Sequence, residues 1–208
     1  MKARKKMAKQ LSLPGFTTTT KTKAHGGELA KGKRKAARPF DPKQSLHVVL
    51  RATKAQGELS LLHPKHCNQI NALLRKLQKR WGISVYRYAN VGNHIHMLLR
   101  ARSRKDWQGF IRALTGGIAM FVTGAKKGKA LHKGKKFWDH LVFTRIVNFG
   151  KDFQNVGRYV LTNLWEGSGV PVRKLLQRGF RVLEINNSGG ILVSTRATSE
   201  ILRALQKN

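Results

Sequence analysis

The sequence predicts an α+β fold, in which helices pack on a small antiparallel sheet in the ferredoxin-like (RRM-like) arrangement. The main observation is the order of strand-like and helix-like segments, which is β-α-β-β-α-β-α. A second is the hydrophobic content of 40%, which is sufficient for a core in a chain whose formal charge is +33. The length of 208 residues fits one domain of ordinary size with extensions.

The first half of the predicted domain contains three strands and one helix. The first strand is the β-branched run 45–51. Apolar residues then recur at intervals of three and four and predict an amphipathic helix that ends at Gly82: Ile70, Leu73, Leu74, Leu77 and Trp81. Two alternating strands follow at 83–89 and 94–100, joined by a tight turn at 91–93.

The second half predicts a helix, a strand and a last helix. Residues 106–122 have helical spacing, although Gly116 and Gly117 weaken its middle. A strand is expected within 137–147. The third helix spans 151–166, with one apolar face made of Phe153, Val156, Val160 and Leu164.

Composition divides the chain into three parts. Residues 1–43 hold 13 Lys and Arg against two acids, which predicts a flexible basic N-terminal arm. Residues 44–167 form the predicted domain. Residues 168–208 are a basic C-terminal extension, in which we expect a short strand pair and a final helix at 199–206.

The charge indicates a polyanionic partner. Nucleic acid is favoured over an anionic membrane surface. The nine Asp and Glu are scattered, which argues against glycosidase or nuclease chemistry that needs clustered carboxylates. The single Cys67 excludes a disulfide framework and is expected to be a small half-buried residue. No apolar run approaches the ~18 residues of a membrane span, and no secretory signal is recognisable, so we expect a cytoplasmic, nucleoid-associated protein.

Two histidines could hold a cation. His94 and His96 are two residues apart on a predicted strand, so both imidazoles point to the same face. This geometry suits two ligands of one divalent metal, although two ordinary strand histidines would show the same pattern.

The third helix adds a nucleophile and a further ligand. Tyr159 and Asn163 are one helical turn apart and share a face. A tyrosine beside a metal can attack a phosphate, and an amide oxygen suits Mg²⁺ or Mn²⁺. Tyr159 could instead be a half-buried aromatic residue. The other tyrosines, Tyr86 and Tyr88, are expected to pack or to stack on a base.

These segments resemble a known family. Asn93-His94-Ile95-His96-Met97-Leu98-Leu99 resembles the HUH motif (His, bulky apolar, His) of single-tyrosine transposases, and Tyr159-Val160-Leu161-Thr162-Asn163 is similar to the Y-x-x-x-N of their nucleophile helix. The run 47–51 resembles their first strand, and 137–147 their tryptophan-led segment. The nearest group is the REP-associated tyrosine transposases of the insertion-sequence-200-like (transposase 17) family.

The resemblance implies a ferredoxin-like HUH domain that cleaves and rejoins single-stranded DNA. Tyr159 would be the nucleophile and would form a 5′-phosphotyrosine. His94 and His96 would bind Mg²⁺ or Mn²⁺, with Asn163 as third ligand. The DNA would be single-stranded or a hairpin, and the protein a monomer or homodimer.

Basic residues of the domain are expected to contact the DNA backbone and to give a steep salt dependence. The candidates are Arg75, Lys79, Arg80, Arg100, Arg102, Arg104, Lys105, Arg112, Lys126 and Lys127.

Two other classes of protein remain open. One is a non-catalytic DNA- or RNA-binding module of the same fold, including a domesticated transposase that has lost turnover. The other is a relaxase or replication initiator with the same motif. A pure binding protein has no need for the combination of His94, His96, Tyr159 and Asn163, which favours the enzyme.

Overall fold

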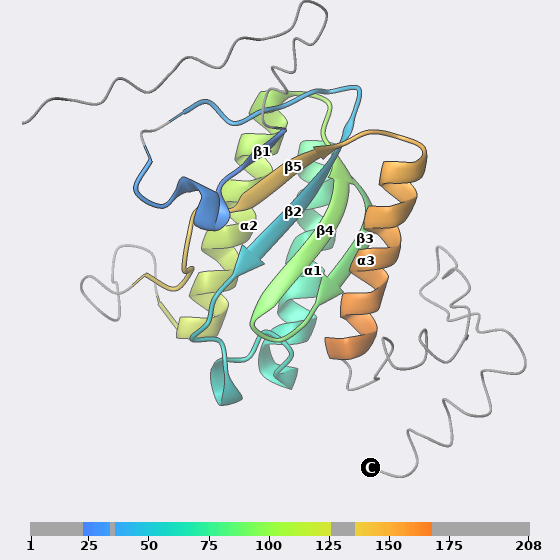
Figure 1. Cartoon of the computed structure of the whole chain (residues 1–208). Helices are drawn as coiled ribbons and strands as arrows, with labels where there is room; N and C mark the ends of the chain where they lie inside the picture. Colours follow the sequence, from blue (N-terminus) through green and yellow to red (C-terminus); the bar gives the residue numbers. More distant parts are fainter. Residues whose placement is uncertain (1–22, 34–35, 126–135, 168–208) are drawn as a thin grey trace, which may run out of the picture.

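The computed structural model describes residues 23–33, 36–125 and 136–167, and its framework is one five-stranded sheet (Figure 1). The strands are β1 (Ala24–His25), β2 (Ser45–Arg51), β3 (Ser84–Asn90), β4 (His94–Arg100) and β5 (Phe143–Val147). Their order is β1-β5-β2-β4-β3, and every neighbouring pair is antiparallel. Without β1, this is the predicted ferredoxin-like order, and the α+β fold class is confirmed.

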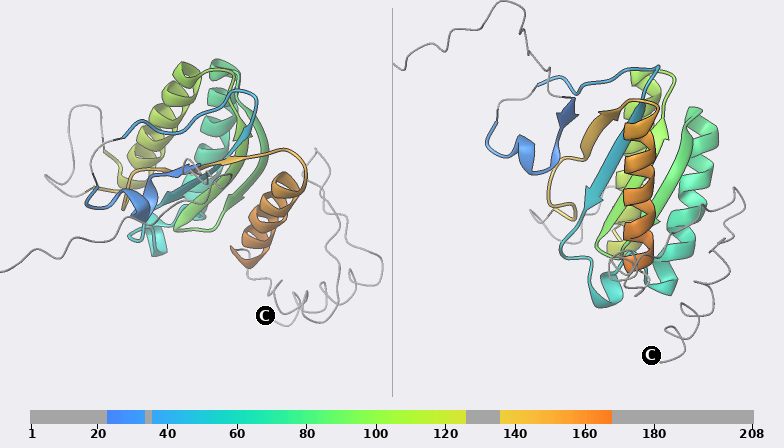
Figure 2. Two further views of the ribbon diagram at one scale, coloured as in Figure 1. Left: turned by 45° about the horizontal axis from the view of Figure 1, so that its top comes forward. Right: turned by 45° about the vertical axis from the view of Figure 1, so that its right-hand side comes forward.

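Three helices enclose the sheet from both faces (Figure 2). Helices α1 (Pro64–Trp81) and α2 (Arg104–Thr123) pack on one face, and α3 (Lys151–Gly167) packs on the other. Two short 3₁₀ segments are η1 (Gly27–Ala30) and η2 (Gly57–Leu59). Local signals fix the helix ends: Ser103 accepts the amide hydrogen of Asp106 at the start of α2, and Gly82 ends α1 in the left-handed conformation.

Alternation along β2 and β4 separates the core from the site. Leu46, Val48 and Leu50 face α1 and α2 together with Ile95, Met97 and Leu99. The intervening residues of both strands therefore point to the α3 face. His47 and His96 are among these intervening residues. The alternation that turns the apolar side chains toward α1 and α2 therefore also turns these histidines toward α3.

Glycines allow α1 and α2 to pack closely. A Cβ at Gly109 would lie 2.4 Å from the Trp81 ring, and one at Gly117 would lie 2.6 Å from Leu73. Gly117, one of the two glycines that weaken the predicted helix at 106–122, therefore lies at this close contact, and α2 continues through it because tertiary packing outweighs its low helical propensity.

The N-terminal region differs from the sequence prediction. Part of the expected flexible arm, 23–33, runs along the sheet edge, where β1 pairs with β5. Gly27 donates its amide hydrogen to Leu141 O, and Arg38 donates to Val142 O and to Thr144 Oγ1. Backbone hydrogen bonds, rather than a hydrophobic stripe, attach residues 23–33 to the sheet, so hydrophobic periodicity does not detect this segment. We call residues 24–30 the edge strap.

Other predictions are confirmed with small shifts of boundary. The strand expected within 137–147 is confined to Phe143–Val147, and Cys67 is partly buried, as expected. The strand pair and helix expected in 168–208 lie outside the described residues. Within the described part of the chain, no helix has the length and hydrophobicity to cross a membrane.

Candidate active site

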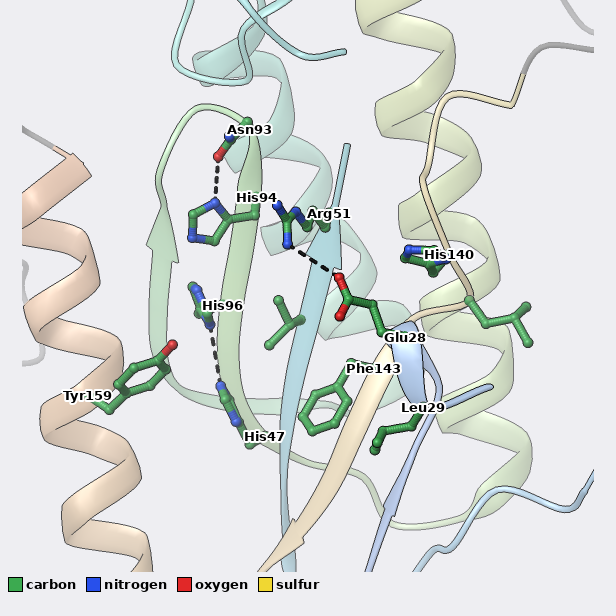
Figure 3. Close-up of a pocket in the computed structure, with 13 residues that line it drawn as sticks. Glu28, Leu29, His47, Arg51, Asn93, His94, His96, His140, Phe143 and Tyr159 are labelled. Carbon is green, nitrogen blue, oxygen red and sulfur yellow. Dashed lines mark hydrogen bonds and ion pairs between the residues drawn. The ribbon is translucent and has the colours of Figure 1, made fainter. Parts of the chain in front are cut away.

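A cavity of about 590 Å³ opens on the α3 face of the sheet (Figure 3). Strands β2, β4 and β5 form its floor, Tyr159 of α3 stands on one side, and the edge strap lies on the other. Its lining residues are Gly27, Glu28, Leu29, His47, Val49, Arg51, Asn93, His94, His96, His140, Leu141, Phe143 and Tyr159.

His94 and His96 lie side by side on the cavity floor, as their spacing predicts. Their ring centres are 4.8 Å apart. His94 Nδ1 donates to Asn93 Oδ1 at 2.5 Å, which leaves its Nε2 free. His96 is only 4% exposed, and its Nε2 is buried without a hydrogen-bond partner.

Both imidazoles are neutral near pH 7. Burial, with repulsion from His94 and His47, lowers the pKa of His96 to about 3. Burial and the charge of Arg51 also lower the pKa of His94. Neutral imidazole is the form that coordinates a metal.

A divalent cation fits these two histidines. The unpartnered His96 Nε2 and the free His94 Nε2 are the atoms that could coordinate it. Across the described ranges, no group of three or more His, Cys, Asp and Glu side chains is arranged to hold a metal ion. Within the described ranges, a further protein ligand would therefore be an amide oxygen, and water or the substrate could complete the coordination.

Tyr159 lies in the same cavity as the histidines. Its ring meets His96 edge-on, with ring centres 5.4 Å apart, and the residue is 45% exposed. Val156 and Val160 hold α3 against the sheet beside Leu98. The packing of α3 therefore fixes the backbone position of Tyr159, while its side chain stays accessible from the cavity.

Asn163 lies one turn further along α3 but does not line the cavity. It is 8% exposed, and its Nδ2 donates to Tyr159 O at 2.7 Å. Gly157 lies beside Leu98 and Gly167 beside Val91, so α3 runs past β4 toward the turn that precedes His94. Asn163 is therefore on the part of α3 that passes alongside His94, and its role as a ligand stays a prediction.

The other two tyrosines do not line the cavity. Tyr86 packs edge-on against Phe153 with ring centres 5.3 Å apart. Tyr88 contributes to the core under α1 and α2, and burial raises the pKa of its hydroxyl. All three tyrosines of the chain are described, and Tyr159 alone lines this cavity.

Several cavity residues are not predicted from the sequence. His47 and Arg51 lie on β2, and Arg51 is the one Lys or Arg that lines the cavity among the described residues. Arg51 pairs with Glu28 of the edge strap and with Asp139, each at 3.8 Å. The alternation of His47, Val49 and Arg51 could have indicated a shared face, but only the pairing of β2 with β4 places them beside the His94–His96 pair.

The predicted DNA-contacting residues lie elsewhere. Those that are described are exposed, but none lines the cavity: Arg75, Lys79, Arg80, Arg100, Arg102, Arg104, Lys105 and Arg112. Most are on α1 and α2, across the sheet from the histidines. Two have structural contacts, since Arg100 Nε donates to Pro42 O and Arg104 donates to Arg38 O. Lys126 and Lys127 lie outside the described residues.

An antiparallel α+β sheet with a His-x-His pair facing a helix tyrosine is the arrangement expected of a single-tyrosine HUH transposase. The chain belongs to the IS200-like transposase family, since the family model "Transposase IS200 like" matches residues 42–163. This membership makes it a DNA transposase.

One of two similar solved structures supports the fold with a TM-score above 0.5. A REP-associated tyrosine transposase bound to a REP hairpin aligns with a TM-score of 0.52 and 12% identity, over 78% of this chain and 100% of that one. A candidate transposase from Deinococcus radiodurans R1 aligns with a TM-score of 0.38 and 18% identity, over 62% of this chain and 98% of that one. No curated protein matches the chain.

Proposed function

We propose that this transposase cleaves and rejoins single-stranded DNA with Tyr159 as its nucleophile and with a divalent metal bound at His94 and His96. The observation that carries the proposal is the placement of Tyr159. It is the one tyrosine that is both exposed to the cavity and in ring contact with a candidate metal ligand.

The cleavage step transfers a phosphodiester from DNA to the protein. The Tyr159 phenol oxygen attacks the phosphorus and gives up its proton, and the bond from phosphorus to the 3′ oxygen breaks. The 3′ oxygen leaves as a hydroxyl, and the 5′ phosphate stays on Tyr159. Attack by a DNA 3′-hydroxyl reverses these changes and releases the tyrosine, so no external energy source is needed.

A Mg²⁺ or Mn²⁺ ion bound here would stabilise negative charge on the scissile phosphate. His94 and His96 would hold it through their Nε2 atoms, and the Asn163 amide oxygen is the proposed third protein ligand. The Asn93 side chain orients His94 by accepting its Nδ1 hydrogen.

Arg51 is suited to bind a phosphate next to the scissile one. It lines the same cavity, and its present partners, Glu28 and Asp139, are carboxylates that a DNA phosphate could replace. The exposed cations on α1 and α2 would add backbone contacts outside the cavity. Because the structurally similar REP-associated transposase was solved with a REP hairpin, a hairpin with a single-stranded flank is the substrate to test first.

Formation of a covalent adduct tests the proposal. The protein is incubated with a set of labelled hairpin DNAs, with Mn²⁺ or with EDTA, and analysed on a denaturing gel. We expect a shifted band that requires Mn²⁺ and is absent from Tyr159→Phe, while Tyr86→Phe keeps it. Both variants should bind DNA like the wild type.

Other outcomes would contradict parts of the proposal. An adduct formed by Tyr159→Phe would refute the nucleophile assignment, and one formed in EDTA would refute the need for metal. Tight, salt-sensitive binding without an adduct across the DNA set would favour a binding protein that has lost turnover.

A further inference from the structure

We propose that His47 is a positioning residue, which fixes the imidazole of His96 in the tautomer and orientation needed to bind the metal. This inference rests on the proposed function, because it assigns a task toward the cation that His94 and His96 would hold.

The strand register brings His47 to His96. In the β2–β4 pair, His47 is opposite Leu98 and Val49 is opposite His96, so the two histidines are diagonal neighbours on one face. His47 is 8% exposed, and its Nε2 lies 3.4 Å from His96 Nδ1. The ring planes differ by 11° and the ring centres are 5.7 Å apart. The rings therefore lie side by side in nearly one plane, which suits an N–H···N hydrogen bond.

The direction of this hydrogen bond decides whether His96 can bind a metal. A neutral imidazole carries hydrogen on one nitrogen only. If His96 Nδ1 donates to His47 Nε2, the His96 Nε2 lone pair is free. If His47 donates instead, His96 Nε2 carries the hydrogen and cannot coordinate. His96 Nε2 is buried without a partner, so a cation would satisfy it in the first arrangement.

Aromatic contacts hold His47 in this position. Phe143 and Tyr159 each meet its ring edge-on, with centres 6.1 Å and 5.8 Å away (Figure 3). Because Tyr159 also contacts His96, the three rings form one cluster, and His47 touches both the candidate nucleophile and a candidate ligand.

Metal affinity of the full-length protein without DNA tests the inference. The variants are His47→Gln, whose side-chain oxygen can accept the His96 hydrogen, and His47→Met, which fills similar space without that acceptor. By isothermal titration with Mn²⁺, we expect His47→Met to bind about 10–100-fold more weakly than wild type. His47→Gln should recover most of the loss. His63→Gln is the matched control, since His63 lies at the start of α1, which packs on the opposite face of the sheet, and its variant should bind like wild type.

The ring nitrogen of His96 that carries the hydrogen is a second measurement. It would not change if His47 only filled space beside His96. Long-range ¹H–¹⁵N NMR of the metal-free protein should show hydrogen on His96 Nδ1 in the wild type and in His47→Gln. In His47→Met the hydrogen should move, at least in part, to Nε2. Thermal unfolding shows whether each variant is folded. If His47→Met is not, His47→Asn, whose shorter amide falls short of His96, takes its place.

The outcomes separate this inference from the proposed function. Equal Mn²⁺ affinity in wild type and His47→Met, or a wild-type His96 with hydrogen on Nε2, would overturn the role of His47 and leave the metal site intact. Absence of Mn²⁺ binding by the wild type would overturn the two-histidine metal site and this inference with it.

Discussion

Mild acid should destabilise the metal-free protein, because two buried histidines must be neutral in its folded state. Burial lowers the pKa of His47 to about 4 and that of His96 to about 3, from an ordinary value of 6.5. A histidine with a lowered folded-state pKa stabilises the fold above its unfolded-state pKa. That contribution is lost as the pH falls toward the folded-state value. The loss for these two residues therefore begins near pH 6.5 and continues to about pH 4 for His47 and about pH 3 for His96.

The size of the effect follows from the shifts. Each pH unit inside the window costs about 1.4 kcal/mol per histidine, so lowering the pH from 7 to 5 should cost roughly 2 kcal/mol for each and roughly 4 kcal/mol for both. Urea unfolding in EDTA at intervals of half a pH unit measures this directly. His96→Gln should show a clearly smaller pH dependence than the wild type. A free energy of unfolding that stays level from pH 7 to 5, or an unchanged slope in His96→Gln, would refute the reasoning.

Three further predictions concern the cavity and its surroundings. Arg51→Gln should weaken binding of single-stranded DNA roughly tenfold, or about 1.4 kcal/mol, measured by fluorescence anisotropy, because it removes the one described Lys or Arg of the cavity; wild-type affinity would contradict this. The double variant Lys79→Gln/Arg80→Gln should reduce the salt dependence of binding yet leave the rate of adduct formation on saturating DNA unchanged, since both residues lie on α1 across the sheet; a slower rate would show that they act at the site. Gly26→Ala should release the edge strap, because Gly26 has φ 84° and ψ −166° and a Cβ would lie 2.0 Å from Val142 O. Limited trypsin digestion should then cut faster at Lys23 and Lys31, and an unchanged digestion pattern would contradict the anchoring.

Much of the framework could be predicted because its signals are local. Alternation along 94–100 gives β4 with its observed bounds and shows that His94 and His96 share a face. Apolar residues that recur every three or four positions predict the three helices. The apolar stripe does not predict the start of α1, because this start depends on a cap in which the His63 side chain accepts the Lys65 amide hydrogen ahead of the stripe.

The remaining features depend on contacts between distant segments. The two-residue β1 is too short to show a period, and it is attached by backbone hydrogen bonds to β5. His47 becomes a site residue only through the β2–β4 register, which no pattern within β2 specifies. The Lys and Arg residues follow no periodic pattern either. The sequence therefore does not distinguish Arg51, which lines the cavity, from the basic residues on the opposite face of the sheet.

Identifying the residue that becomes covalently attached to DNA tests the central claim most directly. Trypsin cleavage after Lys and Arg separates the three tyrosines into different peptides, 81–87, 88–100 and 159–173. Mass spectrometry of the trapped adduct, after nuclease digestion, should find a nucleotide phosphate on Tyr159 in peptide 159–173. A nucleotide on Tyr86, on Tyr88 or on a residue other than tyrosine would contradict the mechanism proposed for this cavity.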